Sequence, residues 1–252
     1  MSLFFYKSIA ALVILLTSLA TLIYPIKTKG RVKHAESFEL GEALASGIFL
    51  GVAFFHMLPS SIHLFYEYSP QIAFPIAEAI CMGGFLLLLF LERLSLTTAL
   101  FDHKQTIPYV LAIILIIHAL TEGMALGIGG SAEALMMFIA IIAHKGSESF
   151  ALCITLMRHH LSFKRIVLIV ACFSLMTPLG IFLGAATDVY TTITGKAMIT
   201  ACFNAFAAGV FLYISTLHHI HFHEHTDKTQ GFLEFGCLAL GLSIMGIIAF
   251  WA

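Results

Sequence analysis

The run LAIILIIHALTEGMALGIGG, residues 111–130, contains only two titratable side chains, His118 and Glu122, set four residues apart. A second apolar run, MMFIAIIAHKGSESFALCITL at residues 136–156, carries the same pair at the same spacing. A helix needs about 20 apolar residues to cross a bilayer, and both runs have that length. Residues i and i+4 share one face of a helix. The two runs therefore predict two membrane spans, each presenting an imidazole beside a carboxylate.

The whole chain has the composition of an all-α polytopic membrane protein. Of its 252 residues, 60% are hydrophobic and 11% are charged, whereas soluble domains carry about 25% charged residues. The formal net charge of -1 gives no reason to expect a nucleic-acid partner. The five cysteines lie in apolar runs without CxxC spacing, so they predict neither a disulfide framework nor a thiolate metal site.

Windows of spanning length predict eight transmembrane helices in a single domain, residues 1–252. The first run lacks a clear cleavage site before Tyr24, so we expect it to be retained as a span. The connections are too short to hold a soluble domain. The expected spans are about 3–26, 40–60, 72–93, 107–128, 133–157, 164–186, 197–217 and 232–251.

Lysine and arginine predict the orientation, because they concentrate in cytoplasmic connections. With the N-terminus outside, ten of the 13 basic residues lie in inner connections, whereas only Lys7 and Lys196 lie on the outer side. We therefore expect both termini to be extracytoplasmic.

Two of the spans resemble each other. ASGIFLGVAFFH (Ala45–His56) aligns without gaps to AAGVFLYISTLH (Ala207–His218), with five of twelve positions identical. The two spans cross in opposite directions, which favours an inverted repeat, the construction of many alternating-access transporters. The predicted arrangement is 3+2+3, with a central pair of helices between two related groups of three. Chance similarity between helices rich in small residues is the alternative.

The predicted spans leave only Glu122 and Glu148, of 14 acidic residues, near mid-depth. An ionisable group there costs about 2.5–3.5 kcal/mol on insertion scales, so it indicates a functional site. With His118 and His144, these carboxylates form a ligand set suited to Zn²⁺ or another first-row divalent metal. An interhelical polar clamp without metal is the alternative. Lys145, three residues before Glu148, is expected to balance charge in place of a second metal ion.

Small residues next to the four ligands predict close packing of the central pair of helices. They are Gly123, Ala125, Gly127, Gly146, Ser147 and Ser149.

Other polar residues are candidates for the metal pathway. His56, placed near the outer end of its span, and Glu78 are expected to guide incoming metal. Ser174, Thr177 and Asn204 could add oxygen ligands, although Ser and Thr more often bond their own helix backbone. The tract HHIHFHEH, in a predicted cytoplasmic loop at residues 218–230, is expected to catch exiting metal; a merely solvated loop is the alternative. Its histidines are His218, His219, His221, His223 and His225.

These motifs resemble those of the ZIP family of divalent-metal transporters along nearly the whole chain. The resemblance rests on ASGIFLGVAFFHMLPS, FPIAEAICMGGFLLLLFLERL and GVFLYIST, and most strongly on HALTEG and HKGSES. It implies eight helices with outward termini and a primary metal site made by His118, Glu122, His144 and Glu148.

The chain departs from the pattern of two-metal ZIP members. Those members carry Asn and an acidic residue where this chain has Ala119 and Lys145, which argues against a second metal. Thr177 and His218 stand where some relatives have glutamate, so metal preference and rate are open.

The sequence thus predicts an importer of Zn²⁺, with Fe²⁺, Mn²⁺ and Cd²⁺ as further candidates, that works by alternating access in a plasma or inner membrane. Metal ions and the lipid bilayer are its expected partners, and a homodimer is left open. The rival hypothesis is an intramembrane zinc hydrolase, because the same ligands could activate water. No HExxH motif occurs, however, and Lys145 is the one spare catalytic group. A third alternative is a metal sensor or scaffold protein that binds metal without transporting it.

Overall fold

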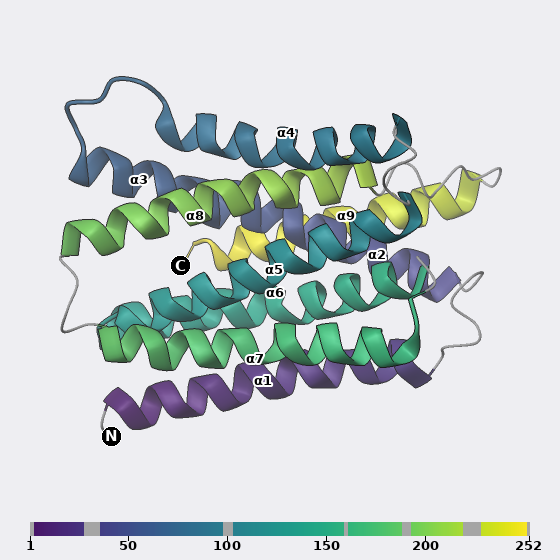
Figure 1. The fold of residues 1–252 in the computed structure, drawn as a ribbon, viewed down its shortest axis with the longest axis horizontal. Helices are drawn as coiled ribbons and strands as arrows, with labels where there is room; N and C mark the ends of the chain where they lie inside the picture. Colours follow the sequence, from purple (N-terminus) through teal and green to yellow (C-terminus); the bar gives the residue numbers. More distant parts are fainter. Residues whose placement is uncertain are drawn as a thin grey trace.

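Eight helical rods make up the part of the chain that the computed structural model describes, namely residues 3–27, 36–97, 103–158, 161–187, 193–218 and 228–250. The elements are α1 (Leu3–Lys27), α2 (Glu36–Val52), η1 (Ala53–Met57), α3 (Leu58–Tyr68), α4 (Ile76–Thr97), α5 (His103–Ile128), α6 (Ser131–Arg158), α7 (Phe163–Thr187), α8 (Ile193–Tyr213), η2 (Ile214–His218) and α9 (Lys228–Ile248). Figure 1 shows these rods side by side, with α1 beginning and α9 ending toward the same end of the bundle.

The number, length and apolar composition of the described helices confirm a polytopic membrane protein. Seven stretches are long and apolar enough to cross a membrane: Leu3–Thr21, Glu39–Tyr68, Leu111–Ile128, Ala134–Arg158, Phe163–Ala186, Ala197–Thr216 and Gln230–Ile248. The eighth rod, α4, occupies the expected third span but is not among these seven. Many large apolar side chains remain exposed along the rods, including Phe4, Leu168 and Phe232, as a lipid-facing surface requires. The side of the membrane that each end faces stays a prediction.

The second rod is longer than the expected span of about residues 40–60, because the helix continues past Pro59 to Tyr68. Elements α2, η1 and α3 follow one another without a break from Glu36 to Tyr68. A proline ring clashes with the carbonyl four residues earlier in a regular α-helix. Here the wide π turn η1 ends two residues before Pro59 and opens the backbone at that point. His56 therefore lies inside a continuous rod, and its predicted place at the end of a span is wrong.

The most extensive helix contact joins α5 to α7, and glycines of both helices lie in it. A Cβ on Gly123 or Gly127 would collide with a backbone carbonyl of α7, and one on Gly180 or Gly184 with a carbonyl of α5. Such contacts replace the hydrophobic effect as the source of helix association in lipid. The prediction that Gly123 and Gly127 let α5 approach α6 closely is therefore wrong, because both glycines face α7. Gly146 of α6 likewise faces Thr21 of α1 instead of α5.

The two similar sequence segments also make similar contacts. Gly47 of α2 packs against the backbone of α9, and Gly209, at the aligned position of α8, packs against the backbone of α4. In addition, α2 contacts η2, and α8 contacts η1. An internal repeat predicts such paired contacts, because each helix of one copy then contacts the same element of the other copy.

Candidate metal site

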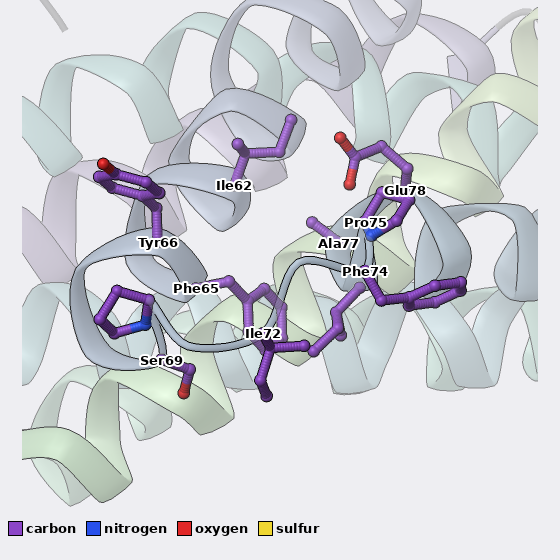
Figure 2. Close-up of a pocket in the computed structure, with 11 residues that line it drawn as sticks. Ile62, Phe65, Tyr66, Ser69, Ile72, Phe74, Pro75, Ala77 and Glu78 are labelled. Atoms are coloured by element: carbon purple, nitrogen blue, oxygen red, sulfur yellow. The ribbon is translucent and has the colours of Figure 1, made fainter.

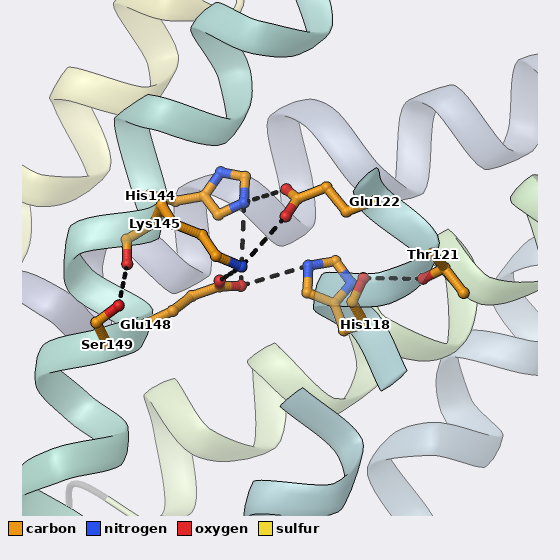
Figure 3. A network of polar contacts seen from close by, with 7 residues as sticks. All are labelled: His118, Thr121, Glu122, His144, Lys145, Glu148 and Ser149. Atoms are coloured by element: carbon orange, nitrogen blue, oxygen red, sulfur yellow. Dashed lines mark hydrogen bonds and ion pairs between the residues drawn. The ribbon is translucent and has the colours of Figure 1, made fainter. Parts of the chain in front are cut away.

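Helices α5 and α6 bring the four predicted ligands together because the turn between them is short. Helix α5 ends at Ile128 and α6 begins at Ser131, so the two helices run in opposite directions from one end of the bundle. Each helix contributes one histidine and one glutamate at i, i+4, which places each pair on a single face of its helix. We call His118, Glu122, His144 and Glu148 the His/Glu cluster (Figure 3).

The contacts within the His/Glu cluster run between the helices. His144 Nε2 lies 2.6 Å from Glu122 Oε1, and His118 Nε2 lies 3.3 Å from Glu148 Oε1. The i, i+4 distance from His144 Nε2 to Glu148 Oε1 is longer, at 3.9 Å. One ligand atom from each of the four residues lies within 4.8 Å of all the others, and all four side chains are buried. Two imidazole nitrogens and two carboxylates this close can hold one divalent metal ion.

Lys145 lies against both carboxylates of the His/Glu cluster. Its Nζ is 2.9 Å from Glu148 Oε2 and 3.5 Å from Glu122 Oε2, and the side chain is fully buried. The ammonium group also lies 4.4 Å from the ring centroid of Phe173 in α7, a cation–π contact that the sequence did not reveal. The contact between Lys145 and Glu148 has the i, i+3 spacing on which the predicted charge-balancing role of Lys145 was based. A fixed positive charge at this distance would repel a second cation.

His56 and Phe211 also lie at the cluster. His56, in η1, lies near enough to His144, Glu122 and His118 for their charges to act on its imidazole. The ring of Phe211, in α8, meets the ring of His118 edge-on, with centroids 5.1 Å apart. Sequence reasoning missed Phe211, although it belongs to the repeated segment, because helical spacing does not show which residues of two separate helices meet.

The hydroxyl groups of Ser174 and Thr177 in α7 are buried and lack a hydrogen-bond partner within the described residues. Serine and threonine hydroxyls in helices usually donate a hydrogen bond to a carbonyl of the same helix, as Thr121 and Ser149 do (Figure 3). The described residues show no such bond for Ser174 and Thr177. The carbonyl of Thr177 packs against Gly123, the residue after Glu122 in α5.

The remaining candidates lie elsewhere or outside the described structure. Glu78 is exposed on the first turn of α4 and lines a hollow of about 130 Å³ with side chains of α3, among them Ile62 and Tyr66 (Figure 2). Asn204 is half-buried in α8, and no hydrogen bond joins it to the His/Glu cluster in the part of the chain described. His218 is the last residue of η2, and α9 begins at Lys228. His219, His221, His223 and His225 fall outside the described residues.

Comparisons with known proteins agree on one family. The model of the family described as ZIP zinc transporter matches residues 4–106 and 98–249. The chain is 26% identical to Zinc transporter ZIP1 of Takifugu rubripes and to Zinc transporter ZIP2 of Homo sapiens, each over 88% of both chains. It is 27% identical to Fe(2+) transport protein 1 of Arabidopsis thaliana, over 98% of this chain and 85% of that one. Protein zntD of Dictyostelium discoideum is 36% identical over 58% of this chain, which covers 22% of that protein.

Proposed function

The chain belongs to the ZIP zinc transporter family, and we propose on that premise that it carries Zn²⁺ across a cell membrane into the cytosol through the His/Glu cluster. One observation carries the proposal: two histidines and two glutamates converge within 4.8 Å in the buried middle of apolar helices. Carboxylates there are costly unless a cation neutralises them. The family consists of transporters, which leaves the hydrolase hypothesis without support.

The donor set supports Zn²⁺ as the principal cargo. Zinc binds imidazole nitrogen and carboxylate oxygen in four-coordinate sites. The same set accepts Fe²⁺, Mn²⁺ and Cd²⁺, since ligand type alone separates these ions poorly. Two relatives are named zinc transporters and one an Fe(2+) transport protein, which matches this breadth.

A single ion per cycle follows from the charges at the cluster. Two carboxylates and the Lys145 ammonium give a net charge of −1 with neutral imidazoles, and one divalent ion changes it to +1. A second divalent ion would bring the net charge to +3 in a buried site, which is strongly unfavourable.

The reciprocal contacts of α2 with η2 and of α8 with η1 support an inverted repeat, and hence alternating access from the two faces. The distribution of lysine and arginine supports extracytoplasmic termini and inward delivery. His56, beside the His/Glu cluster, is the last side chain that we expect an incoming ion to pass. The histidine tract after η2 is expected to receive it on the cytosolic side.

Uptake of radioactive Zn²⁺ into proteoliposomes tests the proposal. The purified protein should take up zinc, and the variants Glu122→Ala and Glu148→Ala should abolish uptake while still inserting. Glu67→Ala is the matched control, because Glu67 is an exposed glutamate at the end of α3. Absence of flux through the unmodified protein would refute transport, and undiminished flux in both cluster variants would refute the site.

A further inference from the structure

Two phenylalanines at the same position of the repeated segments pack on each other. Phe49 of α2 and Phe211 of α8 have ring centroids 4.9 Å apart and an interplanar angle of 32°, and both side chains are buried. In ASGIFLGVAFFH and AAGVFLYISTLH each is the fifth residue. A residue that contacts its own equivalent lies on the symmetry axis relating the two copies. The Phe49–Phe211 pair therefore marks the axis of the repeat.

The His/Glu cluster has a reciprocal arrangement of its own. His144 contacts Glu122, and His118 contacts Glu148, so the histidine of each helix pairs with the glutamate of the other. Phe211 joins the aromatic pair to the cluster, because its ring meets the His118 ring at 74° and 5.1 Å. The aromatic pair thus lies directly against one metal-facing imidazole.

An imidazole that binds metal is normally oriented by a hydrogen bond to its other nitrogen. His144 Nδ1 is buried and has no such partner among the residues described. At His118 the observed neighbour is the aromatic ring of Phe211, which lies nearly perpendicular to the imidazole. Edge-to-face aromatic contacts have a preferred geometry, so they can restrict the angle of a ring as well as fill space.

The backbone around the aromatic pair supports a functional role. Phe49 precedes the π turn η1 by four residues, and Phe211 precedes η2 by three. Single π turns within α-helices occur frequently at functional sites. Both copies of the repeat place an aromatic ring one helical turn before such a π turn, and the two rings meet beside the His/Glu cluster.

We propose that Phe211, supported by Phe49, is a positioning residue that holds the His118 imidazole in its metal-binding orientation and closes the His/Glu cluster to water on the side of α2 and α8. The inference rests on the proposed function only in treating His118 as a metal ligand. Phe211 touches the imidazole and no ion, so it acts on the metal through His118.

The experiment compares Phe211→Leu, Phe49→Leu and the double variant. Leucine keeps an apolar side chain but removes the aromatic ring that lies against His118. We expect Phe211→Leu to raise the KM for zinc uptake about ten-fold, the lower end of what outer groups contribute at metal sites, with a smaller change in maximal rate. Phe49→Leu should act in the same direction more weakly, and the double variant should resemble Phe211→Leu because the two rings act as a unit.

The control is Phe85→Leu, since Phe85 also forms an aromatic pair, with Tyr213 at 5.9 Å, between α4 and α8. The d–d absorption of Co²⁺ bound to the purified protein provides a readout that does not need transport, because it reports ligand geometry. Phe211→Leu should change this spectrum and Phe85→Leu should not. A wild-type KM and Co²⁺ spectrum in Phe211→Leu, or in Phe49→Leu if the first variant does not fold, would overturn the inference. Failure of the unmodified protein to take up zinc would overturn the transport function instead, and the Co²⁺ spectra would still decide the role of Phe211.

Discussion

Helix α5 has two interfaces of opposite character. Toward α7 it presents Gly123 and Gly127, and the two backbones meet with no side chain between them. Toward α6 it presents His118 and Glu122, whose side chains span the gap to ligands on the other helix. The glycine interface fixes where α5 lies, and the polar interface leaves room for an ion. A metal site in the membrane thus depends on a close contact on the opposite side of the same helix.

The largest effect should come from filling the glycine interface. Gly123→Ala places a Cβ against the Thr177 carbonyl and forces α5 away from α7. We expect most of the folded protein to be lost, measured as the monodisperse fraction in detergent. Gly83→Ala in α4 is the matched control, since a Cβ there meets nothing within 4 Å. It should be neutral or slightly stabilising, because alanine favours helix over glycine by about 1 kcal/mol. Equal behaviour of the two variants would contradict the close contact.

The polar interface should respond to the removal of Lys145. Lys145→Met leaves two buried carboxylates without their ammonium partner, and breaking a buried ion pair costs about 3–5 kcal/mol. We expect a lower melting temperature without metal and a larger stabilisation by added Zn²⁺ than in the unmodified protein. Thermal unfolding with and without zinc measures both. Lys164→Met, at an exposed position of α7, should change neither quantity. A variant that melts like the unmodified protein would show that Lys145 does not balance the cluster.

A smaller effect should come from the C-terminal end of α5. Lys7, counted in the sequence as an outer charge, is buried and donates a hydrogen bond of 2.6 Å to the carbonyl of Gly127. A cation at a helix C-terminus contributes about 0.3–1 kcal/mol, and a charged hydrogen bond somewhat more. Lys7→Met should therefore lower the melting temperature modestly, whereas Lys27→Met, exposed at the end of α1, should not. If Lys7→Met melted at the same temperature as the unmodified protein, Lys7 would not stabilise the end of α5.

The sequence predicts the polar interface of α5 far better than the glycine interface. Hydrophobic length locates the helices, and the matched i, i+4 pairs identify the His/Glu cluster, because both signals are local. The partner of Gly123 is not local. The small residues beside the four ligands suggested α6, but the short turn before Ser131 fixes only that two helices are neighbours, not which faces meet. The continuation of the helix beyond His56 was missed for a related reason. The apolar window predicted a span ending near residue 60, and no sequence pattern indicated the π turn that lets the helix continue through Pro59.

The smallest effect should arise at Thr177 of α7, which lies in the glycine interface next to the residue that follows Glu122. Its carbonyl packs on Gly123, and its buried hydroxyl has no hydrogen-bond partner among the described residues. Thr177→Val keeps the shape and removes the unsatisfied group, so stability should stay equal or rise by up to ~1 kcal/mol. With one ion held by the His/Glu cluster alone, the KM for zinc should not change. Ser174→Ala, which removes the neighbouring hydroxyl, is the comparison. A raised KM in Thr177→Val alone would make this hydroxyl a fifth ligand and would join the glycine interface to the metal site.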